Sequence, residues 1–98
     1  MTEFVIKTGS WYAPDKDPNA ILDYSIDWSD WLDTDEISTS TWTVPAGITK
    51  TDESNTTTIA TIWLSGGTAG TTYSLLNRIT TTGGRTADQT FKIYMKEL

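Results

Sequence analysis

The sequence contains neither cysteine nor histidine. Without cysteine, the chain can form no disulfide framework and no thiolate zinc site, and without histidine it lacks the commonest general base and metal ligand. Catalytic triads and zinc centres are therefore excluded. We expect a protein that is not an enzyme and that carries no cofactor.

Long apolar runs and an excess of basic residues are also missing. No stretch approaches the roughly 20 apolar residues that a membrane-spanning helix needs, and the first residues lack the pattern of a signal peptide. Thirteen acidic residues stand against seven basic ones, and the resulting net charge of −6 repels phosphate backbones and anionic membranes. We expect no nucleic-acid partner and no membrane insertion, and a protein that is made in the cytoplasm and stays there until it joins an assembly.

Aromatic residues and threonine are what the chain has instead. Five Trp, four Tyr and two Phe give a small core large apolar surfaces, although only 37% of the residues are hydrophobic. Twenty of the 98 residues are Thr, whose β-branched side chain suits pleated strands. No window keeps helical periodicity for the roughly ten residues that a helix would need. Composition and length together predict one all-β domain with no helix longer than about one turn.

Residues 1–17 differ from the rest of the chain, and we interpret them as an N-terminal arm. A short alternating piece, Glu3 to Thr8, precedes a stretch rich in Pro and Asp, where each Pro removes an amide donor and favours extended backbone. Little local burial offsets the ordering entropy, yet several side chains are apolar. We expect the arm to be poorly ordered in the free monomer and to order against a partner, for example as a strand added to a sheet edge. The arm residues expected to bind that partner are Phe4, Ile6, Trp11, Tyr12 and Pro14.

Residues 18–98 are expected to form an immunoglobulin-like β-sandwich. Alternation of apolar and polar residues predicts strands over 21–28, 37–44, 48–52, 57–64, 71–82 and 88–96. A bulge between Ile37 and Trp42 would bring both onto one face. Gly83 and Gly84 predict a tight turn that pairs the last two strands antiparallel. About seven antiparallel strands with turns every 8–12 residues are typical of such a sandwich.

Apolar strand positions define the expected core. Its members are Tyr24, Ile26, Trp28, Trp42, Val44, Trp63, Tyr73, Leu75, Ile79, Phe91 and Ile93. The run 57–64 is apolar on both parities, which indicates a central strand covered on both faces or one that changes face near its end. Tyr73 also fits a tyrosine corner, whose hydroxyl bonds to upstream backbone, with an ordinary core tyrosine as the alternative.

Two groups of side chains remain as candidates for binding chemistry. Five acidic residues lie within residues 27–36, but they lack the ligand spacing of a calcium loop, so solvated turn acids are favoured over a calcium site or paired catalytic carboxylates. Tryptophans can also stack on sugars, but core packing is favoured for Trp28, Trp42 and Trp63. Trp31 lies in the acidic segment, and we expect it to touch a partner.

Four blocks of the sequence resemble a family of small tailed-bacteriophage virion proteins that are often described as fiber-tail adaptors. The blocks are PNAILDYSIDWSDWL at 18–32, STWTVPAG at 40–47, WLSGGTAGTTY at 63–73, and NRITT with GRT at 77–81 and 84–86. The resemblance covers about residues 18–96 and leaves out residues 1–17. It implies an immunoglobulin-like sandwich in the tail, baseplate or neck of a virion, present in multiple copies in a symmetric assembly and bound to other tail, neck or fiber proteins.

The function expected from this resemblance is that of a structural adaptor, which connects virion components by protein–protein contacts. A carbohydrate-binding module that aids attachment to the host surface is one alternative. A capsid decoration domain is another.

Overall fold

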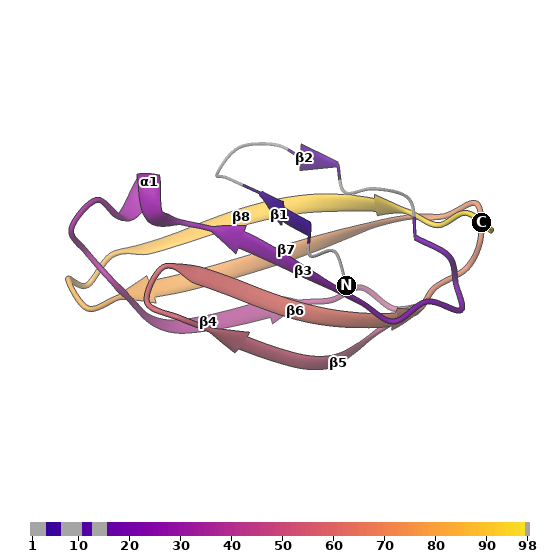
Figure 1. The fold of residues 1–98 in the computed structure, drawn as a ribbon, viewed down its shortest axis with the longest axis horizontal. Coiled ribbons are helices and arrows are strands. Elements are labelled where there is room, and N and C mark those ends of the chain that lie inside the picture. Colours follow the sequence, from indigo (N-terminus) through magenta and orange to yellow (C-terminus); the bar gives the residue numbers. More distant parts are fainter. Residues whose placement is uncertain (1–3, 7–10, 13–15, 98) are drawn as a thin grey trace.

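Two four-stranded sheets pack face to face in the computed structural model, which describes residues 4–6, 11–12 and 16–97 (Figure 1). One sheet has the strand order β1-β3-β6-β5, and the other has the order β2-β8-β7-β4. The strands are β1 (Phe4–Ile6), β2 (Trp11–Tyr12), β3 (Leu22–Asp27), β4 (Ile37–Thr43), β5 (Ile48–Asn55), β6 (Ile59–Gly66), β7 (Thr72–Thr81) and β8 (Thr86–Tyr94). A single helical turn, α1 (Ser29–Leu32), follows β3. No helix in the described ranges is long and apolar enough to cross a bilayer.

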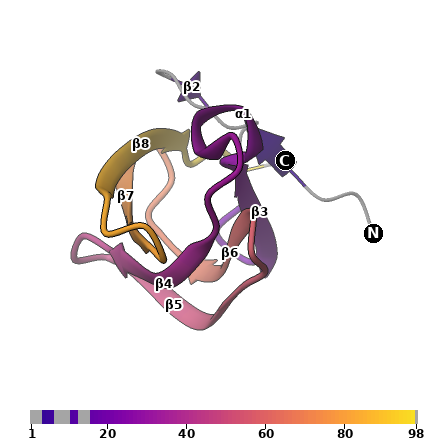
Figure 2. The same ribbon diagram turned by 90° about the vertical axis from the view of Figure 1, so that its left-hand side faces the viewer.

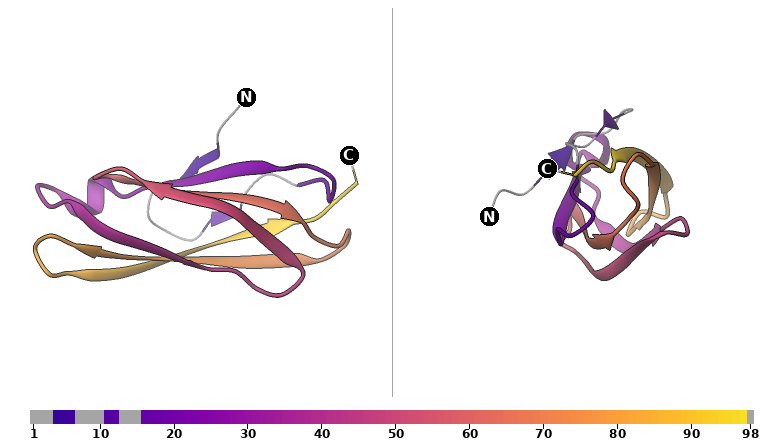
Figure 3. Two further views of the ribbon diagram at one scale, coloured as in Figure 1. Left: turned by 90° about the horizontal axis from the view of Figure 1, so that it is seen from below. Right: turned by 90° about the vertical axis from the view of Figure 1, so that its right-hand side faces the viewer.

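All pairings among the six long strands are antiparallel, as the sequence predicts. The two short N-terminal strands are different, because β1 pairs with β3 and β2 pairs with β8 in parallel. Figure 3 shows β1 beside β3, at the margin of its sheet. The described parts of the stretch expected as an arm thus lie along the sandwich, one strand on each sheet.

The turn between β7 and β8 has the conformation that its glycines predict. Gly84 adopts a φ of 86°, which is accessible to glycine at little cost. The N–H of Thr81 donates to the carbonyl of Arg85 at 2.8 Å, and the N–H of Gly84 donates to the carbonyl of Thr81 at 3.0 Å. Nine register pairs then join the two strands, from Thr72 with Tyr94 to Thr80 with Thr86.

Register shifts explain one success and one error of the sequence prediction. The shift between Ile37 and Thr39 in β4 is the expected bulge, and it leaves both Ile37 and Trp42 buried. In β5, a second shift between Lys50 and Asp52 lets the strand continue to Asn55. The predicted end of this strand at residue 52 is therefore wrong, since polar residues stay exposed on this edge strand without ending it.

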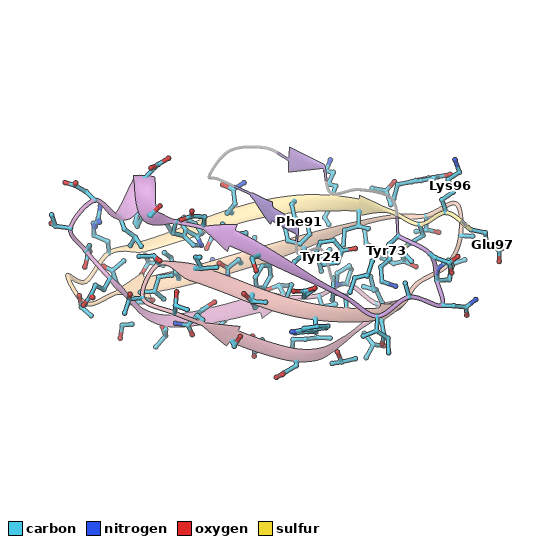
Figure 4. The ribbon with its side chains drawn as sticks, viewed as in Figure 1. Tyr24, Tyr73, Phe91, Lys96 and Glu97 are labelled. Atoms are coloured by element: carbon cyan, nitrogen blue, oxygen red, sulfur yellow. The ribbon has the colours of Figure 1, made fainter. Side chains whose placement is uncertain are left out.

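The core lies between the sheets and is centred on aromatic rings. Phe91 contacts Tyr24 with ring centroids 5.6 Å apart and meets Trp42 edge-on at 5.9 Å. Figure 4 shows Tyr24 and Phe91 close together between the sheets, with Tyr73 nearer the end where the chain terminates. The buried residues among those expected in the core are Tyr24, Ile26, Trp28, Trp42, Tyr73, Leu75, Ile79, Phe91 and Ile93. Val44 is half-buried and packs against them.

Trp63 does not lie in the core, contrary to the expectation. Strand β6 keeps strict alternation, so Ala60, Ile62 and Leu64 are buried between the sheets while Trp63 is half-buried on the outer face. Apolar residues on both parities therefore mark a central strand whose inner face is fully covered and whose outer face is covered only in part.

A buried polar network ties the sheets together near α1. The indole N–H of Trp28 donates to Oδ1 of Asn77 at 3.0 Å, and Nδ2 of Asn77 donates to Oγ of Ser40 and to the carbonyl of Thr41, both at 2.9 Å. Asn77 is fully buried, so these bonds replace the water that its amide loses on folding. The network joins the end of β3 to β7 and β4.

The tyrosine corner expected at Tyr73 is present. The N–H of Thr68 donates to the Tyr73 hydroxyl at 3.0 Å, five residues upstream. The same hydroxyl lies 3.0 Å from the position that a Cβ on Gly47 would occupy, and the φ of Gly47 is 99°. Tyr73 therefore holds the loop between β6 and β7 in place. It also packs against Gly47, where any other residue would strain the backbone.

Candidate protein interface

One end of the sandwich, which we call the α1 end, gathers three connecting segments. They are residues 28–36 with α1, the β5–β6 turn at 56–58, and the β7–β8 turn at 82–85 (Figure 2). Backbone bonds join them: Trp28 N–H donates to Thr58 O and Ile37 N–H to Thr57 O, both at 2.8 Å, and Thr82 N–H donates to Glu36 O at 2.9 Å. The three loops thus form one surface and not three independent ones.

Local sequence explains why α1 forms after β3. The Asp27 carboxylate accepts a hydrogen bond from the Ser29 N–H at 2.9 Å, and the Leu32 N–H donates to the carbonyl of Trp28 at 2.9 Å. Leu32 is buried, and Trp31 meets Trp28 edge-on with centroids 5.6 Å apart. A turn of four residues is marginal alone, so tertiary packing of Leu32 and Trp31 holds it in place.

Arg85, from the β7–β8 turn, binds back onto this helical turn. Its guanidinium carbon lies 4.3 Å from the centre of the Trp31 ring, within cation–π range. Its Nη2 donates to the carbonyl of Leu32 at 3.0 Å, and its Nε pairs with Oδ2 of Asp35 at 3.1 Å. The guanidinium is therefore held on three sides while much of the Arg85 side chain stays exposed.

Asp35 is the acceptor that organises the β7–β8 turn. Its Oδ1 accepts from the Thr82 hydroxyl at 3.1 Å, from the Gly83 N–H at 3.0 Å and from the Glu36 N–H at 2.8 Å. Hydrogen bonds from the Thr81 hydroxyl, the Glu36 N–H, the Arg85 guanidinium and the Gly83 N–H hold the pKa of Asp35 well below its usual range. Asp35 therefore stays ionised as a structural anion.

An open hollow of about 400 Å³ lies beside this cluster. Leu32, Asp33, Thr34, Asp35 and Arg85 line it. Asp33 adopts a φ of 59°, in the left-handed region that costs a non-glycine residue roughly 1–3 kcal/mol. Held in this conformation by its neighbours, the loop presents a fixed, mixed-charge concavity to solvent.

The acidic residues of this segment do not assemble into a cation site. Asp30, Asp33 and Glu36 are exposed, and Asp35 is engaged by hydrogen bonds and Arg85. Within the described ranges, no group of three or more Asp or Glu side chains converges as metal ligands would. What the arrangement can do chemically is bind another surface through an indole, a guanidinium and a shallow hollow.

The structure places the residues expected to bind a partner in two regions. Trp31 is half-buried under Arg85 at the α1 end. Phe4 and Ile6 lie in β1, Trp11 and Tyr12 lie in β2, and Pro14 falls outside the described residues. Sequence reasoning did not connect Asp35 with Arg85, which are 50 positions apart. This pairing could have been inferred from the fold class, because alternate turns of a β-sandwich lie at the same end, where an acidic turn and a basic turn can meet.

Comparison with known proteins gives one family and a common fold. A family model described as "Podophage GP4 fiber-tail adaptor protein gp77" matches residues 16–94. That range includes the whole α1 end and all six long strands, and it excludes β1 and β2. Comparison with curated protein sequences gives no match.

Solved structures with little sequence similarity share the architecture. The crystal structure of the cysteine protease inhibitor EhICP2 from Entamoeba histolytica is 9% identical, with a TM-score of 0.57 over 96% of this chain and 95% of that chain. The solution structure of the PKD domain from KIAA 1837 protein is 20% identical, with a TM-score of 0.50 over 87% and 82%. At these identities the likeness shows the fold alone, which is an immunoglobulin-like β-sandwich.

Proposed function

Because the chain belongs to the podophage GP4 fiber-tail adaptor family, we propose that it is a structural adaptor in the tail of a phage virion, where it connects fiber and tail components by protein–protein contacts. The family match spans the complete six-stranded sandwich, so the adaptor role attaches to that sandwich. Assembly in the host cytoplasm from multiple copies in a symmetric arrangement belongs to the same proposal.

The α1 end is the surface that we propose contacts a neighbouring virion protein. The observation that carries this is the Arg85 guanidinium stacked on Trp31 and bonded to Leu32 O and Asp35. Arginine and tryptophan are the residue types that dominate binding energy in protein interfaces. Here Trp31 is half-buried, Arg85 is exposed, and the two are already held in one geometry, so binding would cost little side-chain entropy.

A matched pair of variants tests this surface. Arg85→Ala removes the stacked guanidinium, and Arg78→Ala removes a guanidinium that pairs with Asp88 on the exposed outer face of β7 and β8, at 2.7 and 3.0 Å. In a phage whose own copy is deleted, we expect Arg85→Ala to lower incorporation into tails at least tenfold, and Arg78→Ala to leave it near the wild-type level. Thermal unfolding of both purified variants controls for loss of the fold. Equal incorporation of two folded variants would exclude the α1 end as the interface.

Trp63 supports carbohydrate binding as a second candidate function. Its half-buried ring lies on the outer face of β6, with Asp23 of β3 and Asp52 of β5 as its neighbours in register. Asp23 is buried and Asp52 is exposed. The uncovered part of the indole could stack on a sugar, and the Asp52 carboxylate could accept hydrogen bonds from the sugar hydroxyls. Titration of the intact protein with host surface glycans separates the two candidate functions. An adaptor with no lectin role shows no saturable glycan binding, and its Trp63→Ala variant gives the same result as the wild type.

A further inference from the structure

The N-terminal strands cover one edge of each sheet. β1 lies along β3 and β2 lies along β8, while the opposite edges are formed by β5 and β4. Figure 2 shows β4 and β5 on the side of the sandwich away from β1 and β2. Without residues 1–15, β3 and β8 would become edge strands with unpaired N–H and C=O groups, which are ready templates for another strand.

The backbone pairing between these strands and the sandwich is short. β1 makes three register pairs with β3, and β2 makes two with β8, whereas β7 and β8 share nine. All five pairs are parallel, and parallel ladders are slightly less stable per residue than antiparallel ones. Releasing β1 and β2 therefore breaks few backbone hydrogen bonds and leaves the pairing among the six long strands unchanged.

Lys16 marks where a released segment would remain attached. Its N–H donates to Tyr94 O at 3.0 Å, and its carbonyl accepts from the Lys96 N–H at 2.9 Å. Its side chain is fully buried, with Nζ donating to the carbonyl of Gly66 at 3.0 Å. The family match also begins at residue 16, so it covers the six long strands without β1 and β2.

We propose that residues 1–15 exchange between copies of this chain, so that β1 and β2 of one copy pair with the free edges of β3 and β8 of its neighbour. A second copy is the occupant because it carries the one sequence already shown to fit these edges, and it would repeat the same register without any new contact. Exchange of an identical element is a low-cost route to association. The inference rests on the proposed function in one respect: an assembly of several copies holds neighbours at effective concentrations on the order of millimolar.

The absence of cysteine makes a direct test possible. Val5 and Ser25 are register partners in β1 and β3, and partners on adjacent strands lie within the Cα separation that a disulfide spans. A full-length Val5→Cys chain is mixed with a full-length Ser25→Cys chain, at concentrations from roughly 10 μM to 1 mM, and then oxidised. A disulfide between the two chains forms efficiently only when β1 of one copy pairs with β3 of the other. We expect this heterodimer to increase with concentration and to exceed the control at least tenfold.

Two control cysteine pairs and one alternative test pair separate strand exchange from random collision and from misfolding. Ser74→Cys, at an exposed position on the outer face of β7, mixed with Ser25→Cys reports random collision. Ser25→Cys/Thr61→Cys in one chain reports a contact internal to the sandwich, since these hydroxyls lie 2.8 Å apart, and it should oxidise only within monomers. If substitution at Ser25 prevents folding, Tyr12→Cys mixed with Lys92→Cys asks the same question at β2 and β8.

The inference is overturned if the mixed chains give no more heterodimer than the Ser74 control at every concentration, while a Val5→Cys/Ser25→Cys double variant closes its disulfide within single chains. This outcome is distinct from failure of the adaptor function. A chain that does not exchange its N-terminal strands but still enters tails would retain the proposed function and lose only this inference.

Discussion

Trp42 and Trp63 are expected to contribute very different amounts to the free energy of unfolding. Trp42 is 8% exposed and packs edge-on against Phe91, whereas Trp63 is half-buried on the outer face of β6. We expect Trp42→Ala to lower the free energy of unfolding by about 3–5 kcal/mol, because it leaves a cavity in the core. Trp63→Ala should lower it by only about 1 kcal/mol, since less area leaves water on folding. Denaturant unfolding measures both, and equal losses would mean that the outer face of β6 is as well covered as the core.

Asn77 contributes to stability through its buried hydrogen bonds. Asn77→Leu keeps similar volume but leaves the buried Trp28 N–H without its acceptor, so we expect a loss of about 1–3 kcal/mol in the free energy of unfolding. Trp28→Phe removes the same donor but leaves a cavity, so the double variant should lose less stability than the sum of the two single losses. If the two substitutions are simply additive in urea unfolding, the hydrogen bond contributes nothing measurable.

Tyr24 provides a spectroscopic check of the core. Burial, with a smaller effect from the Asp23 carboxylate, raises the pKa of Tyr24 to about 12. The neutral phenol is therefore favoured in the folded state, and its contribution to stability is complete below the unfolded pKa of about 10 and lost as the pH rises toward 12. Tyr24→Phe should unfold at higher pH than the wild type. Absorbance of ionised tyrosine, followed alongside dichroism, would contradict this if Tyr24 titrated near pH 10 in folded protein.

At the scale of elements, period-two alternation predicts the strands well because each sheet has one buried face. It located β3, the bulge in β4 and the hairpin of β7 and β8. It placed the end of β5 wrongly, because an exposed edge strand has no apolar face to reveal its length. It also could not place Trp63, since apolar residues on both parities do not say which face is the inner one.

The α1 end was the least predictable element of the candidate site. Asp30, Asp33 and Glu36 are exposed, as the sequence predicts, but Asp35 is not a solvated turn acid. Its bonds to Arg85 and to the β7–β8 turn depend on contacts between segments far apart in sequence. Likewise, the buried Lys16 side chain donates to the carbonyl of Gly66, and no local sequence pattern predicts this contact. Sequence alone can place such residues in loops, but it cannot pair them.

Asp35 gives the α1 end an acid dependence whose sign follows from its lowered pKa. A carboxylate that is stabilised in the folded state contributes stability above its unfolded pKa of about 3.9 and loses it as the pH falls through the folded value. The wild-type unfolding temperature should therefore fall more steeply below about pH 4 than that of Asp35→Asn, and the variant should be the less stable of the two at pH 7. Parallel pH profiles for the two proteins would show that Asp35 is not held by this network.

At the scale of the whole molecule, the family match covers the six long strands and leaves the N-terminal residues outside it. Residues 16–94 match the family, and they include the α1 end and every residue of the core cluster except Met95. Residues 1–15 lie outside the match, and their two strands pair with β3 and β8 at one edge of each sheet. In this account, the α1 end provides contact with other tail proteins, and the N-terminal strands provide contact between copies.

A reconstruction of the intact virion at a resolution that shows side chains tests the central claim most directly. The account predicts this domain in the tail, between fiber and tail components, with Trp31 and Arg85 buried against a neighbouring protein. The account would be contradicted by a domain on the capsid surface, or by a domain in the tail whose α1 end faces solvent in every copy.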